Sequence, residues 1–189
     1  MKKITFLLSL ILCVVLFGCG KSEPVATEIP ETPSPTPEFV EITPDPSVPE
    51  GYVKYQLEEL YFYVPGDYVE GMLDTFQVLY TSQYPEVNDC ILFNTTLAAK
   101  IKDYGKNAVA TKLKANVEGY QKLISYEKVK LAGVETVKVV FQIKNGDTTF
   151  NETQYYMFHE KRTYIISISD FSGQSTKPMQ AIVQSAFFE

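Results

Sequence analysis

The N-terminus carries the feature that most constrains this chain, because it separates a leader segment from the part that can fold. Two lysines follow Met1, and the 14 residues from Ile4 to Phe17 are apolar except for Thr5, Ser9 and the small Cys13. A membrane-spanning helix needs roughly 20 apolar residues, whereas the hydrophobic region of a secretory signal has ~7–15. The pattern therefore predicts a signal that directs the chain out of the cytoplasm and takes no part in the folded domain.

A four-residue motif ends the apolar run. Leu16, Phe17, Gly18 and Cys19 resemble, in order and spacing, the lipobox of bacterial lipoproteins. The resemblance implies a diacylglyceryl group on the Cys19 thiol, cleavage after Gly18, and acylation of the new amine by a fatty acid such as palmitate. One acyl chain holds a protein only marginally, at ~0.8 kcal/mol per buried CH₂, whereas two or three hold it firmly.

We therefore expect residues 1–18 to be a signal peptide and Cys19 to be the lipidation site. The protein would then be anchored in a bacterial cell membrane, facing the extracytoplasmic side. Two alternatives stay open: an ordinary signal peptide followed by a chance cysteine, and a retained transmembrane anchor.

Residues 19–50 differ in composition from the rest of the chain. The stretch from Gly20 to Glu50 holds eight of the eleven prolines, and seven acids against one base. Such a segment cannot bury enough apolar surface to offset its ordering entropy, and its prolines favour an extended chain with a reach on the order of 95 Å at ~3.1 Å per residue. We predict a disordered tether at 19–50 that carries a domain at 51–189. Glycosylation of its Thr and Ser, or recognition of its prolines, are alternatives.

The net charge argues against nucleic acid as a partner. The chain carries −6: the signal contributes +2 through Lys2 and Lys3, the tether −6, and the domain, with fourteen bases and sixteen acids, −2. Nucleic-acid binding requires a basic surface. The same balance argues against electrostatic docking on anionic lipid, so that the acyl chains would have to provide the anchoring.

The domain has one cysteine, Cys90, because Cys13 belongs to the signal and Cys19 to the lipid anchor. No internal disulfide can form. Cys90 lies in an apolar stretch that is typical of a strand, which predicts a buried structural thiol. A reactive nucleophile is the alternative, but no cationic residue lies nearby in sequence to lower its pKa.

Hydrophobic periodicity predicts an α+β domain. Alternation of apolar and polar residues indicates strands, and apolar residues every three to four positions indicate helices. The expected strands are 52–57, 60–64, 76–81, 89–97, 126–131, 134–144, 149–159 and 162–169. A helix is expected over 106–123 and a second from an N-cap at Thr176, with an apolar stripe of Met179, Ile182, Val183, Ala186 and Phe187. Short connections, including an Asn145-Gly146 hairpin, favour an antiparallel sheet flanked by two main helices.

This layout resembles the PsbP/Mog1-like fold, an α/β/α sandwich found in PsbP-related and DcrB-like bacterial lipoproteins. The resemblance rests on Leu60–Pro65, Val129–Glu135, Tyr164–Ile168 and Ile182–Phe187, taken in order, and spans most of the domain. Two features depart from the family pattern: Tyr68 stands near the place of the usual Trp, and Glu135 follows the glycine turn. The resemblance implies an accessory or assembly factor.

No catalytic motif is found in the sequence, so we predict no catalytic, metal-binding or cofactor-binding residues. A dyad of Cys90 and His159, paired carboxylates of a hydrolase, and a metal site of His159 with Glu160 or Glu152 are weaker alternatives. Plant relatives of the fold are associated with manganese and calcium. We expect a non-enzymatic factor that binds a protein of the cell envelope. The alternative is a small-ligand or glycan receptor, whose binding face the thirteen tyrosines could line.

Overall fold

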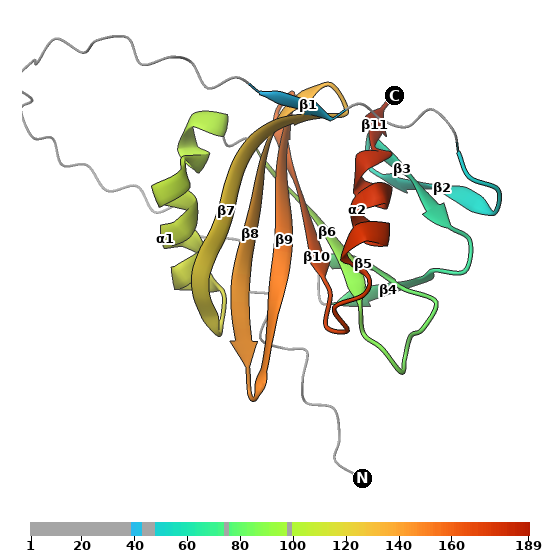
Figure 1. Cartoon of the computed structure of the whole chain (residues 1–189). Coiled ribbons are helices and arrows are strands. Elements are labelled where there is room, and N and C mark those ends of the chain that lie inside the picture. Colours follow the sequence, from blue (N-terminus) through green and yellow to red (C-terminus); the bar gives the residue numbers. More distant parts are fainter. Residues whose placement is uncertain (1–38, 43–47, 74–75, 98–99) are drawn as a thin grey trace, which may run out of the picture.

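A computed structural model of the chain describes residues 39–42, 48–73, 76–97 and 100–189 (Figure 1). The predicted signal peptide, the lipobox from Leu16 to Cys19 and most of the predicted tether lie outside these residues. Within the described ranges, no helix has both the length and the apolar character needed to cross a membrane.

One large sheet organises the described part of the chain. Its strands are β1 (Val40–Ile42), β4 (Val69–Leu73), β5 (Phe76–Tyr80), β6 (Cys90–Leu97), β7 (Tyr120–Leu131), β8 (Val134–Asn145), β9 (Thr148–His159) and β10 (Arg162–Ser169). They lie in the order β1-β7-β8-β9-β10-β6-β5-β4. All neighbours are antiparallel except β1 and β7, which run parallel.

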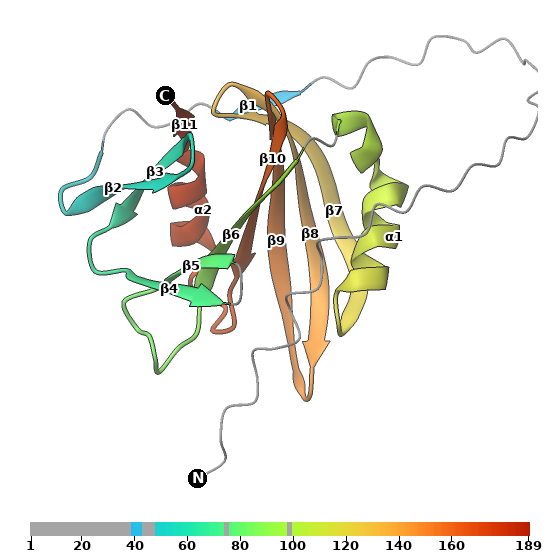
Figure 2. The same ribbon diagram turned by 180° about the vertical axis from the view of Figure 1, so that it is seen from behind.

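A smaller sheet and two helices cover this large sheet. The small sheet contains β2 (Tyr52–Leu57), β3 (Leu60–Pro65) and β11 (Phe187–Phe188) in the order β11-β3-β2. The helices are α1 (Lys106–Asn116), preceded by the short 3-10 turn η1 (Ile101–Tyr104), and α2 (Thr176–Gln184). Seen from both sides, α1 lies against β7 at one end of the molecule, whereas α2 and the small sheet lie at the other (Figures 1 and 2).

Two apolar clusters occupy opposite faces of the large sheet. The α2 cluster joins α2 and the small sheet to the inner face of β6, β9 and β10; its fully buried members include Leu60, Phe62, Phe93, Tyr164, Met179 and Val183. The α1 cluster joins α1 and η1 to β8 and β9 through Val109, Leu113, Val137, Val139 and Phe141. Every buried residue of both clusters lies between Leu57 and Ala186, so the domain has a complete core of its own.

The predicted fold class is confirmed in its coarse form. The structure is α+β, mainly antiparallel, with one helix on each face. The finer expectation of an α/β/α sandwich is met only loosely, because the layer that contains α2 is shared with the small sheet. The Gly turn of the β8–β9 hairpin is also shifted by one residue: Asn145 pairs with Thr148, so Gly146 and Asp147 form the turn, and only Gly146 has a positive φ, 59°.

The first predicted helix was too long. It was expected to reach residue 123, but α1 ends at Asn116 and β7 begins at Tyr120. Gly119 causes the break: its φ is 75°, and a Cβ there would lie 2.1 Å from the Lys144 carbonyl oxygen. Register shifts then follow between Tyr120 and Lys122 and between Leu123 and Ser125.

These shifts explain why the sequence suggested a helix. Each β-bulge adds one residue to the strand, so the apolar residues on one face are spaced by three instead of two. Tyr120, Leu123 and Tyr126 are three apart, and all three pack with the α1 cluster. A strand with two bulges therefore reproduces the spacing of a helical face.

Three further differences concern the ends of elements. The strand β4 was not predicted, and Phe187, expected in the last helix, lies in β11 beside β3. The strand β1 lies in the range predicted as tether, where Val40 pairs with Val129 of β7. The described part of the chain therefore includes one strand within the range expected to be a tether, and the expected boundary at residue 51 stays a prediction.

Two buried carboxylates fix the loop that leads into α2. Asp170 accepts hydrogen bonds from the backbone N–H groups of Gly173 (2.7 Å), Gln174 (3.1 Å), Ser175 (3.1 Å) and Thr176 (2.8 Å). Asp89, which precedes β6, accepts from the N–H groups of Phe171 and Ser172 and from the Ser175 hydroxyl. Thr176 was expected as the N-cap, but it is the first helical residue, and Asp170 satisfies its N–H.

The hydrogen bonds around Asp170 also set its charge state. Burial acts to raise its pKa, but the bonds donated by Thr176, Ser175 and Gly173 hold the pKa below its ordinary value. The carboxylate therefore stays ionised at neutral pH, where each of these bonds is charge-assisted.

We expect Asp170→Ala to lower the free energy of unfolding by about 2–4 kcal/mol, because several buried N–H groups would lose their partner. Urea unfolding at neutral pH measures this change. Glu86→Ala, which removes an exposed carboxylate from a surface loop, is the control and should change stability by less than about 0.5 kcal/mol. Equal effects of the two substitutions would contradict the role given to Asp170.

Candidate functional site

The structure tests some of the residues singled out in the sequence and leaves others untested. Leu16, Phe17, Gly18 and Cys19 lie outside the described residues, so lipidation stays a prediction. The groups that can be placed are Cys90, Glu152, His159 and Glu160.

A row of side chains crosses the large sheet at Glu152. In the strand register, Phe141 of β8 lies beside Glu152 of β9, followed by Ser169 of β10 and Cys90 of β6. Glu152 is only 3% exposed, and the Ser169 hydroxyl donates to its carboxyl group over 3.4 Å. The row thus places a carboxyl group, a hydroxyl and a thiol next to one another inside the protein.

The neighbouring row is also polar. Gln154 lies two residues along β9 from Glu152, and its side-chain amide donates to the Ser167 hydroxyl over 2.6 Å. The Tyr156 hydroxyl donates to the Gln154 carbonyl oxygen. Gln154 and Ser167 are both buried, so a connected polar strip runs along the face of β9 and β10 that carries Glu152.

Burial changes the ionisation of Glu152. Its pKa is raised to about 8, because removal from water disfavours the carboxylate more than hydrogen bonds from Ser169 and Ser167 favour it. The group is therefore mainly protonated near neutral pH. A protonated carboxyl can donate a hydrogen bond as well as accept one.

Cys90 has the environment of a structural thiol. It is 5% exposed, and burial, together with the charges of Glu152 and Asp89, raises its pKa well above the ordinary value. A nucleophilic cysteine needs the opposite shift. The geometry thus favours the structural role that the sequence suggested.

The structure does not bring His159 to Cys90 or to Glu152. Cys90 pairs with Ser169 at one end of β10, whereas His159 pairs with Arg162 at the other end. The His159 ring stacks on Phe188 with ring centroids 3.9 Å apart. Glu152 lies seven residues away along β9, on the opposite face. Within the described ranges, no three His, Cys, Asp or Glu side chains gather as a metal site would require.

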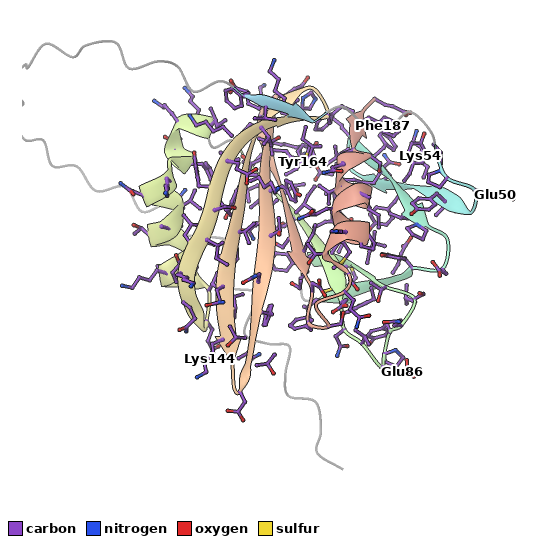
Figure 3. All side chains as sticks on the ribbon, viewed as in Figure 1. Glu50, Lys54, Glu86, Lys144, Tyr164 and Phe187 are labelled. Carbon is purple, nitrogen blue, oxygen red and sulfur yellow. The ribbon has the colours of Figure 1, made fainter. Side chains whose placement is uncertain are left out.

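A second candidate surface lies on the small sheet. The half-exposed rings of Tyr61 and Tyr63 on β3 both stack on Phe187 of β11, with ring centroids 5.6 and 5.5 Å apart. Lys54 of β2 lies 4.0 Å from the Tyr61 ring centre and forms an ion pair with Glu189. Figure 3 shows Lys54 and Phe187 together on this side of the molecule. We call these five residues the aromatic face.

Sequence reasoning missed both arrangements, for two different reasons. Glu152 was considered only as a partner of His159, although its alternation with Phe150, Gln154 and Tyr156 could have placed it on a core-facing side. The aromatic face requires Phe187 to pair with β3, more than 120 residues earlier in the chain. No local pattern signals such a pairing.

Comparisons with known proteins support the fold and leave the function open. No family model matches the sequence, and no curated protein matches it. Among solved structures, the chain is similar to the cyanobacterial PsbP protein, CyanoP, of Synechocystis sp. PCC 6803, with a TM-score of 0.59 and 11% identity over 74% of this chain and 93% of that one.

Two other structures match less well. A protein of Bacteroides thetaiotaomicron VPI-5482 has a TM-score of 0.45 and 14% identity, over 69% of this chain and 45% of that one. The protein PA94 of Pseudomonas aeruginosa has a TM-score of 0.46 and 12% identity, over 69% and 90%. The fold is therefore PsbP-like, on the strength of the CyanoP match.

We expect the free energy of unfolding to fall as the pH rises from about 5 to 8. In this window folded Glu152 keeps a proton that the unfolded chain, with an ordinary pKa near 4.5, has released, so a higher pH favours unfolding. The total effect of Glu152 is up to about 4–5 kcal/mol.

Urea unfolding at several pH values between 5 and 8 measures the slope. Glu152→Gln should remove most of it, because the amide keeps the shape of the carboxyl group and does not titrate. Glu160→Gln changes an exposed turn residue and should leave the slope as in the unmodified protein. A slope that persists in Glu152→Gln would show that another group causes it.

Proposed function

We propose that this chain is an extracytoplasmic bacterial lipoprotein, held at the cell membrane by lipid on Cys19, whose PsbP-like domain binds a protein of the cell envelope. The observation that carries the proposal is the sequence Leu16-Phe17-Gly18-Cys19. It ends a 14-residue apolar segment that two lysines precede. The thiol is the group that a diacylglyceryl transfer requires, and a small residue before it suits cleavage.

Three structural observations support binding over catalysis. Cys90 is buried with a raised pKa, and His159 is stacked on Phe188, so neither is placed as an activated nucleophile or base. The aromatic face, in contrast, presents Tyr61, Tyr63 and Phe187 on an outer surface. Aromatic side chains are enriched among the residues that dominate protein interfaces.

A glycan or other small ligand is the second candidate, and the aromatic face also favours it. A half-exposed ring offers an apolar surface on which a sugar ring can stack, and Lys54, whose ammonium group lies over the Tyr61 ring, adds hydrogen-bond donors beside Tyr63 and Phe187. The two candidates share a surface, so the same substitutions can be tested against both kinds of partner.

The lipid anchor is tested by Cys19→Ala in the producing bacterium. We expect the unmodified protein to sediment with membranes and to incorporate a labelled fatty acid. The variant should incorporate no label, because it lacks the thiol. Cys90→Ala is the matched control and should keep the label. Fatty-acid labelling that survives in Cys19→Ala would refute the proposal.

The partner is tested by a photoreactive side chain at position 56, which lies opposite Tyr61 on the aromatic face. We expect one envelope protein to crosslink there and none at position 86, a loop remote from this face (Figure 3). The purified partner should then bind at least 10-fold more weakly to Tyr61→Ala/Tyr63→Ala, the size of an interface hot spot. If the two substitutions leave the affinity unchanged, the aromatic face is not the binding surface.

A further inference from the structure

The charges of the domain are separated along the sequence. Residues 100–130 contain eight lysines against three acids, Asp103, Glu118 and Glu127, a formal charge of +5. The rest of the domain, 51–99 and 131–189, contains six bases against thirteen acids, or −7. The small net charge of the domain, −2, therefore conceals a basic region and an acidic one.

The basic region forms one side of the folded molecule. Residues 100–130 comprise η1, α1 and β7, and α1 lies along β7 at the end of the molecule away from the small sheet (Figures 1 and 2). We call its lysines the basic face: Lys100, Lys102, Lys106, Lys112, Lys114, Lys122, Lys128 and Lys130. Seven of them are exposed, and Lys128 is half-exposed.

These lysines are not neutralised within the described part of the protein. The ion pairs found there join Lys54 to Glu189, Glu127 to Lys138, and Glu58 to Arg162, so no lysine of the basic face takes part in one. Glu127 is occupied by Lys138, which is outside the basic face. The ammonium groups of Lys112 and Lys128 lie over the rings of Tyr104 and Phe39, which do not neutralise their charge. The array therefore keeps its positive charge and attracts an anionic surface.

Exposed apolar side chains accompany the lysines. Ile124, in the bulged part of β7, is 47% exposed between Lys122 and Lys128 in the sequence. Phe39, which precedes β1, is half-exposed, and the ammonium group of Lys128 lies 5.9 Å from the centre of its ring. Cationic side chains with apolar neighbours are the combination by which a protein surface binds the interface of an anionic bilayer.

The path of the chain favours a membrane as the occupant. The strand β1 pairs with β7, so the N-terminal part of the chain joins the domain at the basic face. If Cys19 carries lipid, the anchor attaches on the same side. Nucleic acid fits less well, because it offers no apolar layer to the exposed side chain of Ile124, whereas the interface of a bilayer does.

We propose that the basic face of α1 and β7 docks on an anionic lipid surface and turns the aromatic face away from the membrane. The biological setting rests on the proposed lipid anchor, but the docking itself is a property of the domain. The sequence had argued against such docking because only the net charge was considered. Each lysine close to an anionic bilayer strengthens binding roughly 5-fold, so a few lysines suffice to orient a domain already held nearby.

The test uses the chain from Gly20 onward, which contains the whole core and lacks Cys19, so the result does not depend on acylation. Its binding is measured by co-sedimentation with vesicles of phosphatidylcholine, alone or with 30% phosphatidylglycerol, at low and high salt. We expect binding only to the anionic vesicles, and its loss at high salt because counterions screen the charges.

Two charge-matched variants locate the surface. Lys106→Gln/Lys114→Gln should weaken binding to the anionic vesicles roughly 10–30-fold. Lys161→Gln/Lys177→Gln removes two exposed lysines elsewhere and should change binding less than about 2-fold. Equal effects of the two pairs, or no preference for anionic vesicles, would overturn the proposal. Salt-dependent binding to duplex DNA or polyglutamate without binding to vesicles would also overturn it.

The vesicle result and the fatty-acid labelling of Cys19 are separate measurements. Failure of vesicle binding with labelling intact would refute only the docking of the basic face. Failure of labelling with vesicle binding intact would refute only the lipid anchor.

Discussion

The burial of β9 on both faces is the constraint on which the rest of the structure depends. Six consecutive residues, Glu152 to Met157, are buried, so neither side of this strand contacts water to a large extent. Tyr155 and Met157 belong to the α2 cluster, whereas Tyr156 belongs to the α1 cluster. The strand therefore joins the two halves of the core, and each helix is required to cover one of its faces.

This two-sided burial also accounts for the polar strip inside the protein. Because alternate residues of β9 must face α1 or α2, Glu152 and Gln154 cannot avoid the interior. The side chain of Gln154 forms hydrogen bonds with Ser167 and Tyr156. Glu152 stays uncharged because its raised pKa keeps the carboxyl group protonated. A buried carboxyl that stays protonated avoids most of the cost of placing a charge in a medium of low dielectric constant.

Much of the fold could be predicted from the sequence because its strands follow one another closely. The meander of β8, β9 and β10 was located to within one or two residues by its alternation and its short turns. The α1–β7 boundary was wrong because two bulges gave strand residues a helical spacing. The pairing of Phe187 with β3 was missed, since it joins distant parts of the chain. The neighbours of Glu152 could not be predicted, because the pairing register of β9 with β8 and β10 is not visible in the sequence. The basic face was missed because the net charge sums the basic and the acidic parts of the domain.

The short strand β1 determines how force would reach the domain. It pairs with β7 over three residues, Val40 to Ile42, at the edge of the sheet, and Val40 is largely exposed. A force applied through the chain N-terminal to β1 would act on the pairing of β1 with β7 before it acts on the buried core. Release of β1 would transfer the load to the chain before β2 and leave both apolar clusters intact. Under load, the connection to the domain would therefore extend before the core unfolds.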